Sequence, residues 1–297
     1  MQWTGHALSQ LCGKLEIGNT YINKCLPFSQ SLVIENLNFW IKATVTKDRD
    51  LMIRSFAKND QVNCRAILSN RYKRIDNVLV ATHSLNKLMD LGATLKYSYY
   101  DGNRMNITAV LPKLAGEVKK GDIVQGGITI ANSEIGDGSL IIEPFIYRLV
   151  CTNGMVVPRI LNKFHARHIG KIVIDPSNDD QAITIINKMQ KQIELVLENE
   201  LFQENLQKLK DATKESVTSN TIQKLAKYHG ISDSEKADIY QRLGRYVSDT
   251  FTTTKYDLAN AITNIANDES KTDERAEFLQ KLGGLIIFTN NPLQVRV

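Results

Sequence analysis

The sequence predicts an α+β fold in which a basic, strand-rich unit precedes a helical unit. Residues 37–175 contain several alternating or β-branched runs separated by glycine-containing turns. After Pro176, apolar residues instead recur at three- and four-residue steps, which is typical of helices. The charge changes at the same place, because residues 1–175 hold 22 Lys+Arg against 14 Asp+Glu (net +8) and the rest 15 against 18 (net −3), together +5. We therefore divide the chain into an N-terminal arm (1–36), a basic α+β core (37–175) and a helical region with a short apolar C-terminal tail (176–297).

The strands expected first lie on either side of a short acidic turn. Residues 37–46 (LNFWIKATVT) have a strand-like composition, and residues 51–57 (LMIRSFA) alternate well enough to be their partner. Residues 62–74 (VNCRAILSNRYKR) predict a further strand that ends in a basic turn. The preceding arm is too weakly patterned to predict a regular element.

A helix and a hairpin follow. From Asp76 onward apolar residues recur at helical spacing, and Gly92 supplies the stop. The segments ATLKYSYY and RMNITAVLP then form a hairpin across Asp101-Gly102-Asn103, a composition that tight turns favour.

The block from Gly126 to Gly170 is the most informative stretch of the sequence. It begins as an alternating strand, turns on Gly136-Asp137-Gly138 and returns as a second apolar strand. A Thr-Asn-Gly turn then leads into a short segment with four basic residues and two histidines. Because a catalytic pocket rarely needs such a run of cations, the block favours a surface that holds an anionic partner.

The last third predicts helices throughout. A long amphipathic helix is expected from Ile183 to Leu209, and its apolar stripe indicates core packing or a helix–helix interface. The final GGLIIFTNNPLQVRV is either a last strand or a tail that docks on a neighbouring subunit. Further helices are expected at 218–228, 234–250, 254–267 and 271–283.

Composition excludes several classes of protein. No apolar run approaches the roughly 20 residues that cross a bilayer, and the first residues lack the pattern of a secretory signal. The four cysteines are widely spread without a C-x-x-C pair, so neither a disulfide framework nor a structural zinc site is expected. A reducing cytosol is the expected location.

Motifs for catalysis are also missing. The glycines match neither a P-loop nor G-x-G-x-x-G, and no G-x-S-x-G surrounds Ser133 or Ser139. Glu134, Asp137 and Glu143 are the one acidic cluster suited to a two-metal nuclease, while His165 and His168 alone do not complete a metal site. We expect no catalytic residue, cofactor or metal.

Nucleic-acid binding remains, because basic segments alternate with aromatic residues such as Tyr72, Tyr97, Tyr99 and Tyr100. Cations for the backbone and rings for stacked bases are the combination that binds single strands without sequence preference. Strict alternation in LKYSYY places Tyr97 and Tyr99 on one face, with Lys96 and Tyr100 opposite. A solvated basic face and half-buried tyrosines are the alternative interpretation. The candidate phosphate contacts are Arg65, Arg71, Lys73, Arg74, Lys119, Lys120, Arg148, Arg159, Lys163, Arg167 and His168.

Three segments carry a family resemblance. RAILSNRYKRIDN (65–77), GGITIANSEIGDGSLIIEPFIYRLVCTNGMV (126–156) and HARHIG (165–170) resemble a phage/plasmid-like protein family of unknown function, over roughly residues 40–215. The N-S-E-x-G…RLVCTNG run is the most specific part. The resemblance implies a protein of a mobile genetic element in a bacterial host, and it supplies no active site.

Two function classes are compatible with these observations. The first is a phage single-strand annealing protein, a class that combines a basic sheet-and-helix unit with C-terminal helices and acts as an oligomer. Its partners would be single-stranded DNA and further copies of the chain. The second is an anti-defence or regulatory protein of a mobile element that binds a host protein through the C-terminal helices. The position of the cations discriminates between them: annealing requires them along one groove, whereas local pairing with acids weakens that hypothesis.

Overall fold

A computed structural model describes residues 2–44, 50–58, 61–70, 72, 74–150, 152–158, 164–166, 179–293 and 295. The fold is α+β, as predicted, with antiparallel pairing in the main sheet and helices in the last third.

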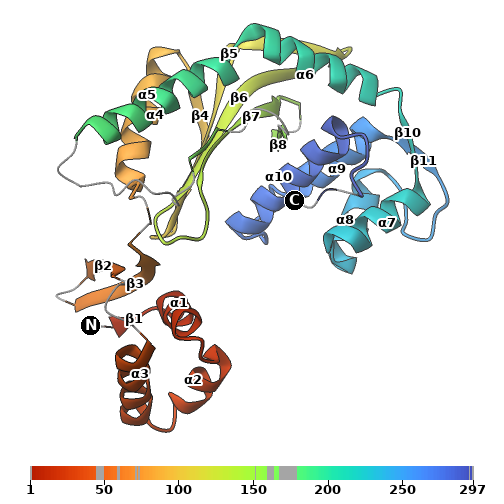
Figure 1. Ribbon diagram of the computed structural model, residues 1–297. Helices are drawn as coiled ribbons and strands as arrows, with labels where there is room; N and C mark the ends of the chain where they lie inside the picture. The colour runs from red at the N-terminus through yellow and green to blue at the C-terminus, as the bar shows by residue number, and fades with distance from the viewer. Residues whose placement is uncertain are drawn as a thin grey trace.

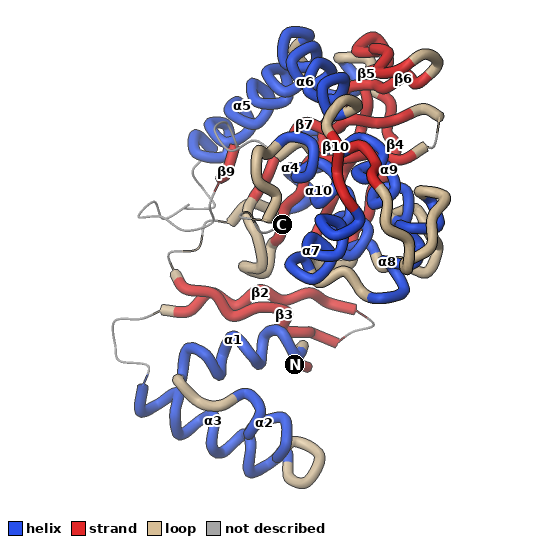
Figure 2. Tube along the Cα trace, turned by 90° about the vertical axis from the view of Figure 1, so that its right-hand side faces the viewer, coloured by secondary structure: helices blue, strands red, loops and turns tan. Residues whose placement is uncertain are grey.

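The N-terminal unit, residues 2–74, consists of helices packed on a small sheet (Figures 1 and 2). Thr4 caps α1 by accepting a hydrogen bond from the Ala7 N–H. Strand β1 pairs in parallel with β3, and β2 pairs antiparallel with the other side of β3. The elements are β1 (Gln2–Trp3), α1 (Gly5–Leu15), α2 (Asn19–Cys25), α3 (Gln30–Thr44), β2 (Leu51–Lys58) and β3 (Gln61–Ser69).

Two predictions for this unit are wrong. The expected irregular arm contains α1 and α2, and the strand expected at 37–46 is helical as far as Thr44. The physical reason is the spacing of Val33, Leu37 and Ile41, which share one face of α3 and pack on the other helices. The strand predicted at 51–57 is confirmed, but its partner is β3.

A long, curved sheet forms the centre of the molecule (Figure 1). Its strands follow the order β4-β5-β6-β7-β8, and β9 pairs with β7. The hairpins predicted across residues 101–103 and 136–138 are confirmed, as is the helix before them. The elements are α4 (Asn77–Asp90), β4 (Thr94–Tyr100), β5 (Arg104–Lys119), β6 (Asp122–Ser133), β7 (Leu140–Arg148), β8 (Asn153–Val156) and β9 (Phe164–Ala166).

Helices cover one face of this sheet. Helices α4, α5 and α6 lie across it in Figure 1, and the main apolar core lies between them and the strands. Ile128, Ile130 and Ile142 are almost fully buried there, as is Met189 from α5. The alternating apolar residues of β5, β6 and β7 therefore supply the buried face that their pattern predicts.

The C-terminal region is helical, but its boundaries differ from the prediction. The helix expected from Ile183 to Leu209 is two helices, because Glu198 adopts an extended backbone and begins α6. The helix expected at 234–250 ends at Arg242. The elements are α5 (Asp179–Val196), α6 (Asn199–Ala212), β10 (Ser216–Thr218), α7 (Ser219–His229), α8 (Asp233–Arg242), β11 (Thr252–Thr254), α9 (Lys255–Ile265) and α10 (Asp273–Phe288).

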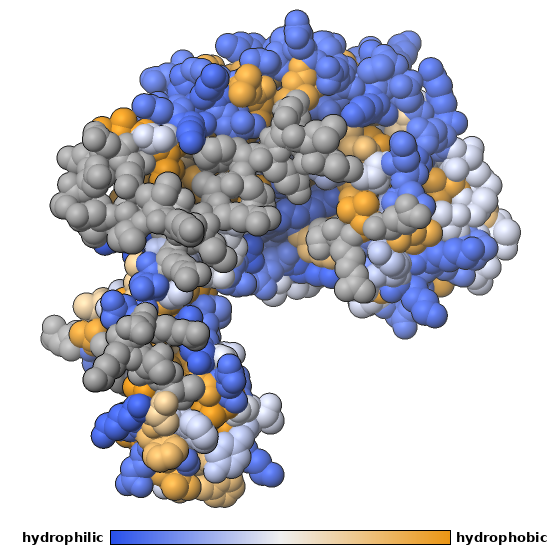
Figure 3. Space-filling model, in the orientation of Figure 1, coloured by the Kyte–Doolittle hydropathy of each residue, from blue (hydrophilic) through white to orange (hydrophobic). Residues whose placement is uncertain are grey.

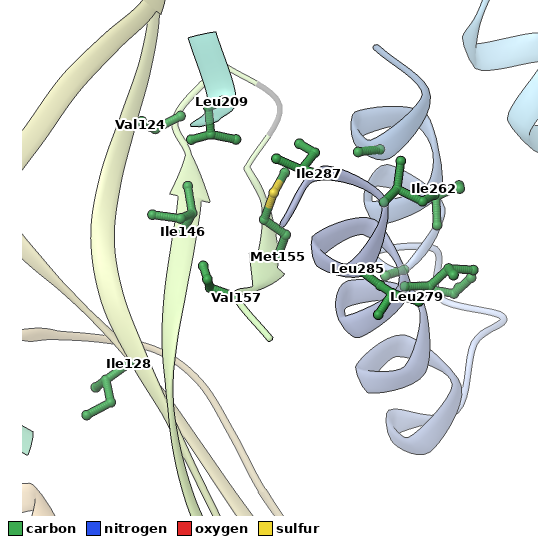
Figure 4. Packing of buried hydrophobic residues seen from close by; sticks show 14 of the residues in the cluster. Val124, Ile128, Ile146, Met155, Val157, Leu209, Ile262, Leu279, Leu285 and Ile287 are labelled. Atoms are coloured by element: carbon green, nitrogen blue, oxygen red, sulfur yellow. The ribbon is translucent and has the colours of Figure 1, made fainter. Parts of the chain in front are cut away.

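The apolar part of the C-terminal run, residues 283–288, is the end of α10 and not a strand. Leu285 and Ile287 are buried, and Figure 4 shows Ile287 close to Met155 of β8. Gly284 permits this approach, since a Cβ at that position would overlap the Val156 carbonyl. The C-terminal helices are thus anchored to the edge of the sheet.

No helix within the described ranges is both long and apolar enough to cross a membrane.

Candidate nucleic-acid interface

The structure describes five of the eleven predicted phosphate contacts, and they divide into two groups. Arg65 and Arg74 lie where the N-terminal unit meets the main sheet, whereas Lys119, Lys120 and Arg148 lie at the opposite end of β5. The other six fall outside the described residues: Arg71, Lys73, Arg159, Lys163, Arg167 and His168.

The first group surrounds Glu134, the acidic residue of the N-S-E-x-G motif. Its side chain is only 6% exposed, and one carboxylate oxygen pairs with the guanidinium groups of both Arg65 and Arg54, the latter at 3.2 Å. The other oxygen accepts a hydrogen bond of 2.5 Å from the Asn77 N–H at the start of α4. Arg65 also donates to the Gly102 carbonyl at 2.7 Å. Arg65 therefore neutralises a buried acid inside the fold, and its charge does not face solvent.

Arg74 belongs to the same network through Asp76. Arg74 donates to one Asp76 oxygen at 2.6 Å from Nε, and Arg54 donates to the other at 2.7 Å. Burial opposes ionisation of Asp76, but the hydrogen bonds from Arg74 and Arg54 lower its pKa below the ordinary value. Arg74 remains about half exposed, so it is the one described cation of this group with access to solvent.

The loop after Glu134 completes the connection to the N-terminal unit. The Ile135 carbonyl accepts a hydrogen bond of 2.7 Å from Gln10 of α1, and its side chain packs with Leu68 and Tyr72. Tyr72 donates to the Ser133 carbonyl at 3.1 Å, and its burial raises the pKa of the phenol. The most specific sequence motif of the chain thus holds two parts of the fold together.

The second group surrounds Asp122, at the start of β6. Arg148 donates to both carboxylate oxygens of Asp122, at 2.6 and 2.7 Å, and Tyr256 of α9 donates to one of them at 2.9 Å. Asp122 is 6% exposed. A bidentate pair of this kind fixes both side chains, so Arg148 is engaged inside the fold in the same manner as Arg65.

Two lysines beside this group face solvent. Lys119 is 42% exposed and donates to Asp257 at 2.8 Å. Burial raises the pKa of Asp257, but the hydrogen bond from Lys119 lowers it. The pKa of Asp257 is therefore below the ordinary value. Lys120, in the β5–β6 turn, is exposed and has no ion-pair partner among the described residues. Lys120 is therefore the described candidate whose charge is most available.

Tyr97, Tyr99 and Tyr100, three of the four tyrosines predicted to stack on bases, lie on β4, an edge strand of the sheet, whereas the fourth, Tyr72, is buried. Six of the seven residues of β4 are exposed, including Tyr97 (38%) and Tyr100 (59%). A register shift at Lys96 interrupts the alternation, and the ammonium group lies 4.8 Å from the ring centre of Tyr147. Tyr147 shares a sheet face with Tyr97, so the prediction that Lys96 faces away from Tyr97 is wrong because of this bulge.

Helix α10 positions the two inner tyrosines. Tyr97 donates to Asp273, Tyr99 donates to Glu277 at 3.1 Å, and the ring centres lie 5.9 Å apart. Burial and the acidic acceptors raise the pKa of both phenols. Burial raises the pKa of Glu277, but the nearby Lys281, Arg104 and Tyr99 outweigh this effect, so that the pKa is lower than the ordinary value. The rings are thereby held in fixed positions along the strand.

Sequence reasoning missed two cations, one near β4 and one beside Glu134. Lys113 is exposed on β5 just beyond the start of β4, so it lies between Lys96 and the Lys119–Lys120 turn. The feature of the sequence that could have identified Lys113 is its position beside a proline in an otherwise apolar strand. Arg54, the second partner of Glu134, gave no signal because its acid lies 80 residues away in the sequence.

The acidic residues proposed for a nuclease do not form a metal site. Glu134 is engaged with arginines, Asp137 is exposed in the loop, and Glu143 is buried in β7. In the ranges that the structure describes, no three His, Cys, Asp or Glu side chains gather to hold a metal.

Comparison with known proteins gives one match. Neither the curated proteins nor the solved structures match the chain. A family model matches residues 66–281, from β3 to α10, and so includes the N-S-E-x-G motif with Glu134, the Asp122 network and the β4 edge, whereas Arg54 and Arg65, which pair with Glu134, precede it. The chain therefore belongs to the family described as a domain of unknown function (DUF932).

Proposed function

We propose that the protein binds single-stranded DNA and promotes the pairing of complementary strands, as a recombination protein of a phage or plasmid in a bacterial cytoplasm. The observation that carries the proposal is the β4 edge strand, where Tyr97, Tyr100 and Lys96 are all exposed, with Tyr97 on one face of the sheet and Tyr100 on the other. Rings and cations in that arrangement suit stacked bases and their phosphates. The net charge of +8 on residues 1–175 supports an anionic partner.

The proposed contact surface differs from the one that the sequence alone favours. Arg65 and Arg148 each neutralise a buried carboxylate, so we assign them a structural role. The proposed track consists of Tyr100, Tyr97 and Lys96 on β4, then Lys113 on β5 and Lys120 in the β5–β6 turn. Phosphate contacts from lysines give affinity without sequence preference, and an exposed base can then meet its complement.

Binding and annealing of fluorescent oligonucleotides test the proposal. The wild-type protein should bind a single strand and anneal it to its complement faster than the protein-free control. Tyr100→Ala should weaken binding roughly tenfold, because stacking contributes about 1–3 kcal/mol per base. Lys96→Glu should weaken it further by placing a negative charge beside the phosphates.

The matched control is Lys227→Glu, which makes the same charge change at an exposed position of α7. It should leave binding within about twofold of wild type, since a remote exposed charge acts only through screened interactions. Absence of binding at low salt, or equal losses in Lys96→Glu and Lys227→Glu, would rule out the β4 track.

A further inference from the structure

A pocket with a volume of about 510 Å³ lies at the junction between the N-terminal unit and the main sheet. Figure 3 shows the N-terminal unit, at the lower left, joined to the rest of the molecule over a narrow region. The pocket is lined by α1 and the end of β3 on one side and by the β6–β7 loop on the other. Gln10 of α1 connects the two sides, since it donates to the Ile135 carbonyl at 2.7 Å and accepts from the Ile67 N–H at 2.8 Å. A ligand in this pocket would therefore contact both parts of the fold.

The wall formed by β3 and Tyr72 is apolar. The side chains of Ile67, Leu68 and Tyr72 are buried. The Tyr72 hydroxyl donates to the Ser133 carbonyl at 3.1 Å and accepts a hydrogen bond from the Gly136 N–H, so both bonds fix the ring. A pocket of several hundred cubic ångströms with an apolar wall and a few polar groups is typical of sites for small molecules. This wall suits the flat part of such a ligand.

The rest of the lining carries polar side chains. Lys14, in the last turn of α1, is the one charged residue that lines the pocket within the described ranges, and no described carboxylate pairs with it. The hydroxyls of Ser69 and Ser139 likewise have no hydrogen-bond partner among the residues described. Asp137, the acid of the loop, is exposed and does not line the pocket. The pocket thus offers a positive charge and two hydroxyls, which favour an anionic ligand.

Glycines leave the backbone of the β6–β7 loop open to a ligand. Gly136 and Gly138 have φ values of +81° and +150°, which residues with a side chain rarely adopt. Gly138 lines the pocket with main-chain atoms alone, and neither its N–H nor that of Ser139 has an acceptor in the part of the chain that the structure describes. Peptide N–H groups near a lysine and two hydroxyls form a donor set that suits a phosphate.

We propose that this pocket binds a phosphorylated ligand of mononucleotide size. Lys14, Ser139 and the loop N–H groups hold the phosphate, and the flat part of the ligand lies against Leu68 and Tyr72. Phosphate is favoured over carboxylate because its oxygens can accept from all of these donors at once.

The inference goes beyond single-strand binding at β4 and does not rest on it, since none of the described residues that line the pocket belongs to the β4 track. A free mononucleotide and the 5′-phosphate end of a strand have the required chemistry in common. The experiment separates these two sources.

Calorimetric titration of the full chain with dAMP tests the pocket. The wild type should bind dAMP at least about tenfold more tightly than deoxyadenosine, which lacks the phosphate. Lys14→Glu should weaken dAMP binding at least about tenfold, whereas Lys14→Arg keeps the charge and should stay within about threefold of the wild type. The matched control is Lys24→Glu, which makes the same charge change at an exposed position of α2 outside the pocket. It should leave dAMP binding within about twofold of the wild type.

Thermal melting shows whether the variants fold and whether the ligand stabilises them. Without ligand, Lys14→Glu should melt like the wild type, because Lys14 has no ion pair among the described residues to lose. dAMP should raise the melting temperature of the wild type and not that of Lys14→Glu, since a ligand that binds the folded state stabilises it. Lys96→Glu should bind dAMP like the wild type, so a failure of the β4 track would leave this result intact.

Oligonucleotides with and without a 5′-phosphate, titrated into Lys96→Glu, identify the source of the phosphate. If the ligand is a strand end, the phosphorylated strand should bind at least about tenfold more tightly, and Lys14→Glu/Lys96→Glu should lose this preference. If the ligand is a free mononucleotide, dAMP should bind and the two strands should not differ. Binding of neither dAMP nor the 5′-phosphate, or equal losses in Lys14→Glu and Lys24→Glu, would overturn the proposal.

Discussion

Glu134 shows how one residue can decide the role of several others. Its buried carboxylate receives two arginines and the first N–H of α4, and these groups come from three different elements. Removing one partner from a buried ion pair is costly because the remaining charges lose their compensation. The motif that is most distinctive in the sequence therefore contributes to stability and to the connection between units.

Glu134→Gln should lower the free energy of unfolding by about 3 kcal/mol, because Arg65 is left without a charged partner and Arg54 keeps only Asp76. Urea unfolding at neutral pH measures this, with Asp137→Asn as the control at an exposed site three residues away. Equal unfolding midpoints for the two variants would show that the network is not needed.

Glu235 provides a prediction for pH dependence. Hydrogen bonds from Arg275, acting against burial, lower its pKa from 4.5 to about 2. A lowered pKa in the folded state adds stability above the unfolded pKa, and this contribution is lost as pH falls from about 4.5 through 2. Glu235→Gln retains a side chain that can cap α8 but removes the charge. The variant should be less stable than the wild type at pH 7. Urea unfolding should show this difference in stability vanishing near pH 2. A difference in stability that does not change with pH would exclude the ion pair as the source of that difference.

At the scale of elements, the contact between α10 and β8 explains an unusual sequence. Gly283 and Gly284 lie inside a helix, where glycine is ordinarily unfavourable. Their absent side chains allow α10 to approach Thr263 of α9 and the backbone of β8. The glycine pair thus exchanges helix propensity for close packing between three elements.

Gly284→Ala should destabilise the protein even though alanine is the better helix former, because the new Cβ would overlap the Val156 carbonyl. Gly13→Ala is the matched control, since nothing lies within 4 Å of its Cβ position in α1. It should raise stability by about 0.5–1 kcal/mol. Thermal melting compares the two, and a stabilising Gly284→Ala would contradict the packing described.

Over the whole molecule, sequence patterns predicted what depends on local chemistry. Helix α4 and the β4–β5 and β6–β7 hairpins were predicted because their spacing and turn residues are local signals. The expected strand at 37–46 was wrong because the aromatic and β-branched residues of α3 also satisfy a helical spacing. The error concerns an element whose composition suits both a strand and a helix.

The candidate site was harder to predict for a different reason. Arg65 and Arg148 have the sequence context of surface cations, yet their acids lie 69 and 26 residues away in the chain. Only the fold brings each pair together. The tyrosines of β4 were found because aromatic residues gather in one short strand, whereas Lys113 has no such neighbours.

Binding of a fluorescent single strand across a salt series tests the central claim most directly. Affinity should fall linearly with salt on logarithmic axes, with a slope of about −0.7 for each phosphate neutralised. The triple variant Lys96→Gln/Lys113→Gln/Lys120→Gln should reduce that slope by about 2, because three contacts are removed, while Lys227→Gln should leave it unchanged. No binding at low salt, or a slope that the triple variant does not alter, would contradict the assignment of the β4 track as a nucleic-acid interface.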